Sequence, residues 1–219
     1  NGVTLKLADG SSAHGDALVG SDGIKSAIRT QIVGETKANY TGYVAWRLTV
    51  PREKLPKDIM ELVGAVWCGP KNHAVIYWLC SGNLLNFVGC PAHEAWEDES
   101  WNQVRPWEEL KAAYAGWHPK VQAILDAVDH TQCYRWALNN CAPINNWSTA
   151  RASLLGDAAH PTLPFLAQGA AMAIEDGAVL ARALEGSDSV ADGLQVYQRA
   201  RMERTAKVVT ESTAQAGIY

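Results

Sequence analysis

The sequence predicts a mixed α/β protein in which two α/β end segments form one domain around an inserted, sheet-rich segment. All nine tryptophans lie between Trp46 and Trp147, so the middle of the chain differs in composition from both ends. Strand-like and helix-like runs alternate at the ends, whereas the middle contains several strand-like runs in succession. We therefore expect one domain from residues 1–42 and 150–219, and a second domain from residues 43–149.

The bulk composition is that of an ordinary globular protein. Of the 219 residues, 47% are hydrophobic and 19% are charged. The net charge is −4 without a block of five like charges, which points to neither a nucleic-acid partner nor a membrane surface. No apolar run approaches the roughly 18 residues of a spanning helix, and no secretion signal is visible. The five cysteines lack C-x-x-C spacing, so we expect free thiols, no metal site and a cytoplasmic protein.

The amino-terminal residues predict a β-hairpin, a strand and a short helix. Residues 1–29 begin with alternating apolar and polar positions around the turn signal Asp9-Gly10. A strand then ends in "DALVGSDG", and a helix begins near Ile24. Because the first residue, Asn1, stands directly before the hairpin, we interpret the chain as a piece of a longer protein.

The middle of the chain predicts a β-sheet followed by helices. Strand-like runs follow one another from Tyr43 to Cys90, with a hairpin signal in the residues SGN at 81–83. Residues 106–129 carry apolar residues at helical spacing, and Pro106 suits a first helical position. The residues "SLLGDAAH" then return to a strand and a turn.

Two long helices are expected near the carboxyl end. The helix from about Gln168 to Leu184 is apolar almost all round, which predicts burial on several sides. The second helix covers residues 189–216. We expect its basic residues to form a solvated face: Arg199, Arg201, Arg204 and Lys207.

The stretch "GSDGIKSAIR", residues 20–29, joins a strand to a helix through a turn at Asp22-Gly23. Glycine permits a close approach to the backbone, and the free N–H groups of a helix start favour an anion such as a phosphate. Arg29 lies one to two turns into the helix. The alternative is an ordinary strand–turn–helix corner in which Asp22 caps the helix.

The stretch at 154–177, "LLGDAAHPTLPFLAQGAAMAIEDG", has the same plan on a larger scale. Gly156 closes a strand, so the Asp157 carboxylate projects from a tight turn, where it could accept hydrogen bonds from a sugar hydroxyl. Residues 168–170 open a helix whose N–H groups suit a ring atom with partial negative charge. The alternative is a capped helix with His160 as a structural turn histidine. Asp157 and His160 lack a third partner for a metal.

These two stretches resemble the D-G and G-D motifs of the class A flavoprotein monooxygenases, which include the salicylate and hydroxybenzoate hydroxylases. "YTGYVAWRLTVP" is similar to the strand that opens the family's substrate domain, and the resemblance covers essentially all 219 residues. It implies a partial, Rossmann-like FAD-binding domain that is split around an inserted β-sheet substrate domain with helices. The family's G-x-G-x-x-G turn, which holds the ADP half of FAD, is missing. The resemblance therefore implies a fragment that lacks this segment.

Carried over by position, the resemblance implies nine cofactor-binding residues: Asp22, Gly23, Arg29, Gly156, Asp157, Pro164, Gln168, Gly169 and Ala170. The first three lie near the FAD pyrophosphate and the passing nicotinamide cofactor. Asp157 binds hydroxyls on the ribityl or ribose side of FAD, while Gly156 permits the close approach. Pro164 lies beside the flavin and the substrate, and the helix start offers N–H groups to the pyrimidine edge of the isoalloxazine.

His73 and Tyr77 are the expected catalytic pair. Their four-residue spacing puts them on one face of a strand, about 13 Å apart at about 3.3 Å per residue. By the resemblance, the pair binds the substrate and helps to remove its phenolic proton. The alternative is a surface histidine and a packing tyrosine. Arg47 could pair with a substrate carboxylate or form a salt bridge within the sheet.

The resemblance implies a monooxygenase that uses FAD, O2 and either NADH or NADPH. It would hydroxylate a small, phenolic acid-like aromatic substrate through a flavin C4a-hydroperoxide. Two alternatives stay open: a relative such as a flavin-dependent epoxidase, and a truncated flavin-fold module without activity. The oligomeric state is left open.

Overall fold

The computed structural model describes residues 2–94 and 103–216. These residues form two compact units. The first unit joins the described residues up to Asn39 to those from Asn139 onward, and the second unit comprises Tyr40–Leu138. Residues 139–149, which were expected in the inserted segment, cluster with the first unit.

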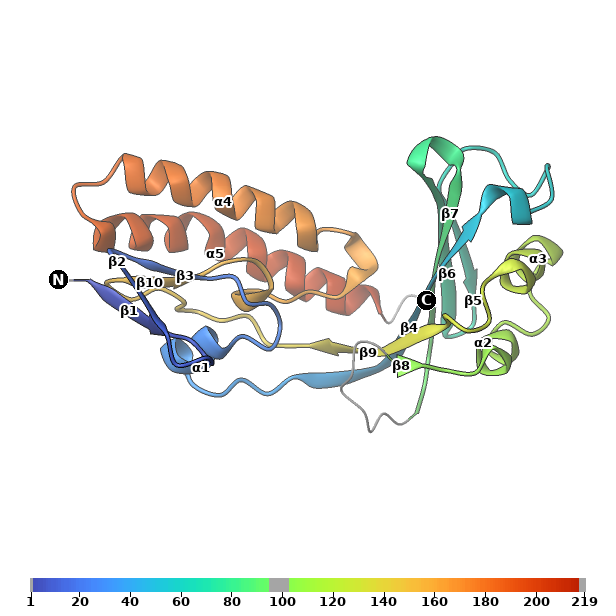
Figure 1. Cartoon of the computed structure of the whole chain (residues 1–219), viewed down its shortest axis with the longest axis horizontal. Coiled ribbons are helices and arrows are strands. Elements are labelled where there is room, and N and C mark those ends of the chain that lie inside the picture. Colours follow the sequence, from blue (N-terminus) through green and yellow to red (C-terminus); the bar gives the residue numbers. More distant parts are fainter. Residues whose placement is uncertain (1, 95–102, 217–219) are drawn as a thin grey trace. The chain divides into compact units, whose positions relative to one another are not determined.

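The first unit contains two separate pairs of strands (Figure 1). β1 (Val3–Lys6) and β2 (Ser12–Gly15) form the antiparallel hairpin that the sequence predicts. Asp9 accepts two hydrogen bonds within its turn. β3 (Leu18–Gly20) pairs in parallel with β10 (Ala152–Leu154), so strands from the two ends of the chain lie side by side.

Three helices belong to the first unit: α1 (Ala27–Val33), α4 (Gly169–Glu185) and α5 (Val190–Gln215). α1 begins three residues later than Ile24, because the hydroxyl of Ser26 caps it. α4 and α5 lie side by side and are joined by a short loop (Figure 1). No helix among the described residues is long and apolar enough to cross a membrane.

α4 is buried along one face and not on several sides, so that expectation is wrong. Its buried residues, Met172, Asp176, Leu180 and Ala183, recur at helical spacing. Ile174, on another side of the helix, is 75% exposed. Most apolar residues of α4 are alanines, whose small side chains bury little area and need no cover.

The hydrophobic core of the first unit shows where the chain re-enters this unit after the inserted segment. Trp147, Leu154, Leu194 and Tyr197 are almost fully buried in one cluster. Ile144 belongs to the same cluster, so residues on both sides of β10 pack here. The first unit resumes at Asn139, before the border predicted at residue 149. The prediction took all tryptophans as markers of the inserted segment, but Trp147 packs in the core of the first unit.

The second unit contains a six-stranded sheet in the order β5–β6–β7–β4–β9–β8. The strands are β4 (Asn39–Pro51), β5 (Ala65–Gly69), β6 (Asn72–Leu79), β7 (Leu84–Pro91), β8 (Gln103–Val104) and β9 (Tyr134–Asn140). The pairs β5–β6, β6–β7, β7–β4 and β8–β9 are antiparallel. The turn predicted at 81–83 joins β6 to β7, where a 3-10 turn covers Cys80–Gly82. Another 3-10 turn, Arg52–Lys54, follows β4.

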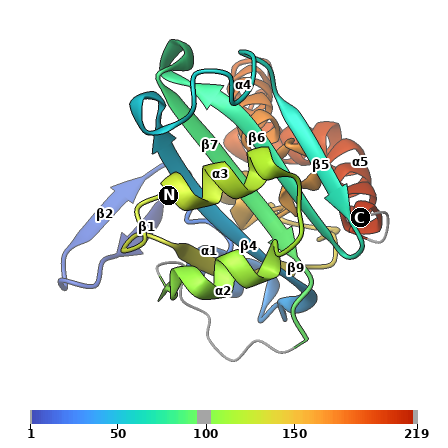
Figure 2. The ribbon, with the colours of Figure 1, turned by 90° about the vertical axis from the view of Figure 1, so that its right-hand side faces the viewer.

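Two helices, α2 (Trp107–Ala113) and α3 (Pro119–Ala127), lie across one face of this sheet (Figure 2). The predicted helical region is therefore interrupted, and Pro119 begins the second helix, where its missing N–H is not needed. The core between the sheet and the helices consists of buried side chains that include Trp46, Ile76, Phe87, Leu110 and Leu125.

Candidate functional site

The loop after β10 makes a tight turn at Gly156. Gly156 has a φ of +61°, and a Cβ atom there would lie 3.2 Å from the Cβ of Ala173 in α4. The left-handed backbone and the close contact with α4 both favour glycine. Gly156–Ala158 form one 3-10 turn, on which Asp157 is exposed to solvent. Protein atoms around the Asp157 carboxyl shield it from water and raise its pKa. The nearby His160 partly offsets this increase in pKa.

Asp176, in the middle of α4, holds this turn in place. Its fully buried carboxylate accepts a hydrogen bond from the Gly156 N–H at 3.0 Å. It also accepts from Nε2 of His160 at 2.6 Å and from Nε of Arg201 at 2.7 Å. Burial by itself raises the pKa of Asp176, but these hydrogen bonds and the charged partners hold it below its ordinary value. The charged carboxylate therefore fixes the backbone of the turn.

His160 serves this arrangement as a structural residue. It is 3% exposed, and its ring lies 5.8 Å from the ring of Trp147. Nδ1 of His160 has no hydrogen-bond partner among the described residues, so the ring contacts Asp176 through Nε2. No group of three or more His, Cys, Asp or Glu residues in the described ranges could hold a metal ion.

Arg201 does not belong to a solvated face, so that part of the prediction is wrong. It is 5% exposed and ion-paired with Asp176, and its Nη2 also donates to Glu175 at 2.7 Å. Arg204 donates to the same Glu175 carboxylate. The hydrogen bonds from Arg204 and Arg201 lower the pKa of Glu175 to about 2. A chain of ion pairs thus joins α5 to α4, from the surface inward to Asp176.

Arg29 connects the two turn motifs at residues 20–29 and 154–177. The side chain is 5% exposed, and its Nη1 donates to the carbonyls of Asp157 at 3.3 Å and Ala158 at 3.1 Å. Its Nη2 donates to the carbonyl of Ile24, and its Nε donates to the hydroxyl of Thr36 at 2.9 Å. The guanidinium therefore ties α1 to the turn after β10. Its expected position near the FAD pyrophosphate stays a prediction.

The turn before α1 is held by Asp22. Its carboxylate accepts hydrogen bonds from the hydroxyl of Ser26 at 2.5 Å and from the N–H of Ile28 at 3.2 Å. Partial burial raises the pKa of Asp22, but these hydrogen bonds lower it below its ordinary value. The hydroxyl of Ser26 accepts from the N–H of Arg29 at 2.8 Å, so Ser26 and not Asp22 is the N-cap residue of α1, although Asp22 also accepts from an N–H of the first turn. Gly23 has a φ of +80° and open space beside it.

The start of α4 is open. Pro164–Leu166 form a 3-10 turn, and Ala167 takes a left-handed φ of +52° before the helix begins. This conformation is strained for a residue with a side chain. Gln168 precedes the helix without a side-chain cap, and Gly169 is half-buried while Ala170 is exposed. Because the first N–H groups of an α-helix lack partners within the helix, this start offers donors to a polar ligand.

On the face of the sheet that is turned away from α2 and α3, side chains of the second unit form three cross-strand rows. The three cross-strand rows are Cys68–His73–Cys90, then Val66–Val75–Val88–Arg47, then Tyr77–Asn86–Thr49. Residues that face one another across paired strands point to the same side of the sheet. None of these residues belongs to the core cluster beneath α2 and α3. We call this surface, defined by the three rows, the far face.

The far face contains the expected pair His73 and Tyr77 at opposite ends. His73 is 2% exposed, and burial lowers its pKa to about 4, so its imidazole is neutral at pH 7. A surface histidine is therefore excluded. Tyr77 is half-buried. Cys90, directly opposite His73, is buried, and burial raises the pKa of its thiol to about 12.

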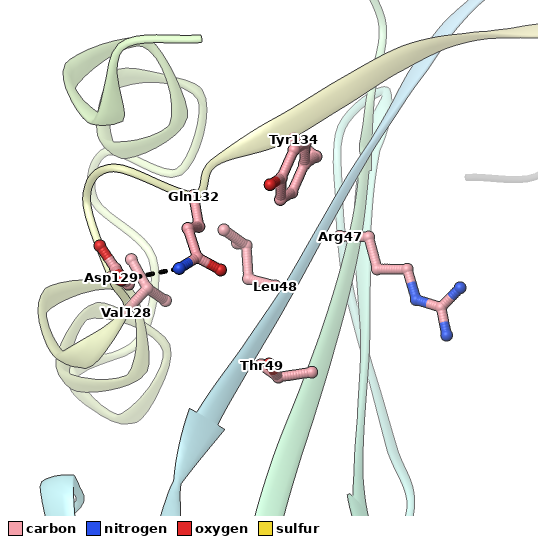
Figure 3. A pocket seen from close by; sticks show the side chains of 7 residues that line it. All are labelled: Arg47, Leu48, Thr49, Val128, Asp129, Gln132 and Tyr134. Carbon is pink, nitrogen blue, oxygen red and sulfur yellow. Dashed lines mark hydrogen bonds between the residues drawn. The ribbon is translucent and has the colours of Figure 1, made fainter. Parts of the chain in front are cut away.

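A small pocket of about 200 Å³ lies at the edge of β4 (Figure 3). It is lined by Arg47, Leu48, Thr49, Val128, Asp129, Gln132 and Tyr134. Gln132 donates to the Asp129 carboxylate at 3.1 Å, and the side chain of Arg47 extends away from the other lining side chains. Arg47 is exposed, and no ion pair with another described residue includes it. Arg47 therefore forms no salt bridge within the described part of the sheet.

The first unit thus has a parallel strand pair, a glycine turn clamped on a helix, and an open helix start. The model of the FAD binding domain family matches residues 3–212 of the chain. The chain belongs to this family.

Individual relatives agree. The chain is 36% identical over 219 residues to the 3-hydroxybenzoate 6-hydroxylase of Polaromonas naphthalenivorans (strain CJ2), covering 99% of this chain and 54% of the relative. It is also 36% identical over 214 residues to the 6-hydroxynicotinate 3-monooxygenase of Pseudomonas fluorescens, covering 95% and 54%. The structure of Klebsiella pneumoniae HpxO complexed with FAD and uric acid is similar with a TM-score of 0.88 and 30% identity, over 99% of this chain and 55% of that chain. The chain spans about half the length of these relatives.

Sequence reasoning missed Asp176, the residue that fixes the turn. A carboxylate inside an alanine-rich, largely apolar helix is a usable signal, because a buried charge needs partners. The partners themselves could not be read from the pattern, since they lie 16 to 25 positions away in the chain. The structure brings Asp22, Arg29 and Asp157 into one unit, joined through Arg29.

Proposed function

We propose that this protein acts as an FAD-dependent, NAD(P)H-using monooxygenase that hydroxylates a small aromatic acid bearing a phenolic group. The observation that carries the proposal is the turn at Gly156, which Asp176 clamps while Asp157 stays exposed beside it. The membership in the FAD binding domain family supports the cofactor. The names of the similar hydroxylases support an aromatic acid with a hydroxyl group as the substrate class.

The residues of the first unit fit FAD. Gly156 lets the turn pack closely against α4, and the Asp157 carboxylate beside it is exposed and can accept hydrogen bonds from ribityl or ribose hydroxyls. Gly169 and Ala170 offer N–H groups and the positive end of a helix dipole to the pyrimidine edge of the flavin. We assign flanking roles toward the same cofactor to Asp22, Gly23, Arg29, Pro164 and Gln168. When bound, FAD supplies the redox chemistry with O2 and the nicotinamide cofactor.

His73 and Tyr77 would act on the phenolic group of the substrate. Because burial keeps the imidazole of His73 neutral, a ring nitrogen can accept a hydrogen bond from the substrate hydroxyl. A base whose pKa is about 4 holds a proton weakly, so His73 polarises and orients the O–H bond rather than storing its proton. The hydroxyl of Tyr77, two rows away, is the second proposed partner of the ring substituents.

Cofactor binding is tested by titrating the chain with FAD and following the quenching of flavin fluorescence. We expect saturable binding, and an Asp157→Ala variant should bind about tenfold more weakly because it loses hydrogen bonds to a charged acceptor. Asp188→Ala, at an exposed aspartate outside both motifs, is the matched control and should bind like the wild type. Equal weakening in both variants would contradict the assignment of Asp157.

The reaction class is tested by NADH and NADPH oxidation in the presence of 3-hydroxybenzoate, 6-hydroxynicotinate or an unactivated alkene. We expect the phenolic acids to stimulate oxidation and to yield a dihydroxylated product that mass spectrometry detects. Stimulation by the alkene alone would favour the epoxidase alternative. FAD binding without stimulation by any compound would favour a flavin-binding module that lacks activity.

A further inference from the structure

Asn86, in the row of the far face that lies farthest from His73, is buried without a hydrogen-bond partner. Its side chain is 0% exposed, and neither Nδ2 nor Oδ1 has a partner among the described residues. A buried amide that lacks partners lowers the free energy of unfolding, so such a group calls for a specific explanation. A leucine of similar size would fill the same space without this cost.

The position of Asn86 excludes a role in the core beneath the helices. Its neighbours in β7, Leu85 and Phe87, point into that core and are fully buried. Asn86 points to the opposite side, where it lies directly across from Tyr77 in β6 and from Thr49 in β4. It therefore belongs to the same surface as the proposed catalytic pair.

The far face has the chemical layout of a site for an aromatic acid. Its middle row presents Val75 and Val88, which suit the apolar ring. One end presents His73, and Asn86 lies at the other end, four residues and thus about 13 Å along the sheet. Arg47 in β4 is the diagonal neighbour of Asn86, a spacing of about 7–8 Å. Arg47 supplies a positive charge that pairs with no described acidic residue.

We propose that Asn86 binds the ring carboxylate of the substrate through its Nδ2 hydrogens, with Arg47 as the adjacent positive charge, and thereby selects acids over neutral phenols. This inference rests on the proposed function and names the part of the substrate that the second unit recognises. Val75 and Val88 then contact the ring, and His73 contacts the hydroxyl group. Tyr77, half-buried beside Asn86, is the side chain that a ligand would move to reach the amide.

The test combines a variant of Asn86 with truncated ligands. The dissociation constants of 3-hydroxybenzoate, benzoate and phenol are measured by calorimetry, with excess FAD present, for the wild-type chain and for Asn86→Leu. We expect Asn86→Leu to weaken the binding of the two acids about ten- to a hundredfold and to leave the binding of phenol unchanged. The same variant should raise Tm by about 2–4 °C, because it removes a buried amide without partners.

Asn72→Leu is the matched control. Asn72 is 6% exposed and stands in β6, but its Nδ2 donates to the carbonyl of Ala113 at the end of α2. This variant should lower Tm and leave the preference for acids over phenol intact. Gain of stability with loss of acid binding is a combination that a purely structural amide would not produce.

The outcomes separate the inference from the proposed function. If the wild type binds both acids and Asn86→Leu binds them equally well, the inference is overturned while the proposed function stands. A lower Tm for Asn86→Leu, with acid binding retained, would likewise overturn it by showing a structural amide. If the wild type binds none of the three compounds, the proposed substrate class fails and the inference falls with it.

Discussion

Two buried polar sites of this molecule are built in opposite ways. In the first unit, the Asp176 carboxylate is fully buried, accepts three hydrogen bonds and is paired with the guanidinium of Arg201. On the far face of the second unit, the amide of Asn86 is equally buried and has no partner among the described residues. His73, on the same face, is kept neutral by burial.

The difference shows that a buried polar group can either hold the protein around it in place or be available to bind a ligand. A buried charge whose partners are all supplied by the protein holds its surroundings in one arrangement, and here it fixes the turn at Gly156. A buried polar group without a partner lowers the stability of the folded state, and a ligand that supplies the partner recovers this cost. Under our proposals, Asp176 holds the backbone turn beside the cofactor, whereas Asn86 offers its amide to the substrate.

The largest expected effect comes from breaking the paired site. Asp176→Ala leaves Nε of the buried Arg201 without its carboxylate partner, although Nη2 keeps Glu175, and it releases the Gly156 N–H. The free energy of unfolding should therefore fall by about 3–5 kcal/mol. Urea denaturation measures this loss. Glu175→Ala, the control, removes a half-exposed carboxylate of the same network and should cost much less, because water screens it. Similar losses in both variants would show that Asp176 does not hold the turn.

The next effect concerns the neutral histidine of the far face. The unfolded chain binds a proton on His73 below pH 6.5, whereas the folded chain binds it only below about pH 4. The unfolded state therefore holds more protons between these values, and stability is lost as the pH falls from 6.5 to 4, by at most about 3 kcal/mol. His73→Gln should flatten this slope in denaturation curves. An equal slope in the wild type and in the variant would contradict a buried, neutral His73.

A smaller effect is expected at the glycine turn, where the two motifs can be compared directly. Gly156→Ala combines a left-handed backbone with a 3.2 Å contact to Ala173 and should cost about 2 kcal/mol. Gly23→Ala meets the same backbone strain in open space and should cost about 1 kcal/mol. Thermal unfolding compares the two, and FAD titration should show weaker binding for Gly156→Ala. Equal costs would mean that the turn at Gly156 can relax away from α4.

The smallest effect tests the outer end of the ion-pair chain. Arg204→Ala removes an exposed partner of Glu175 while Arg201 remains. We expect Tm to change by no more than about 2 °C and the change to vanish in high salt, since exposed pairs are screened. A loss as large as that of Asp176→Ala would indicate that the network acts as one unit.

Local sequence signals predicted several elements well. The hairpin around Asp9, the strand ending at Gly20 and the turn at 81–83 are confirmed, because each depends on turn residues and alternation within a few positions. The two carboxyl-terminal helices begin and end within about one residue of their predicted limits. The start of α1 was missed by three residues, because the hydroxyl of Ser26 competes with the earlier turn signal.

The sequence by itself determined the order of the elements, the two glycine-aspartate turns and the shared face of His73 and Tyr77, since all of these follow from spacing along the chain. Only the tertiary structure decided that Arg201 is buried, that Arg29 joins the two turns, and that Asn86 lies buried without a partner. These properties depend on atoms that come from distant positions in the chain. Hydrophobic pattern indicates which face of an element is buried, but the partner of a buried polar group is fixed by the packing of elements against one another.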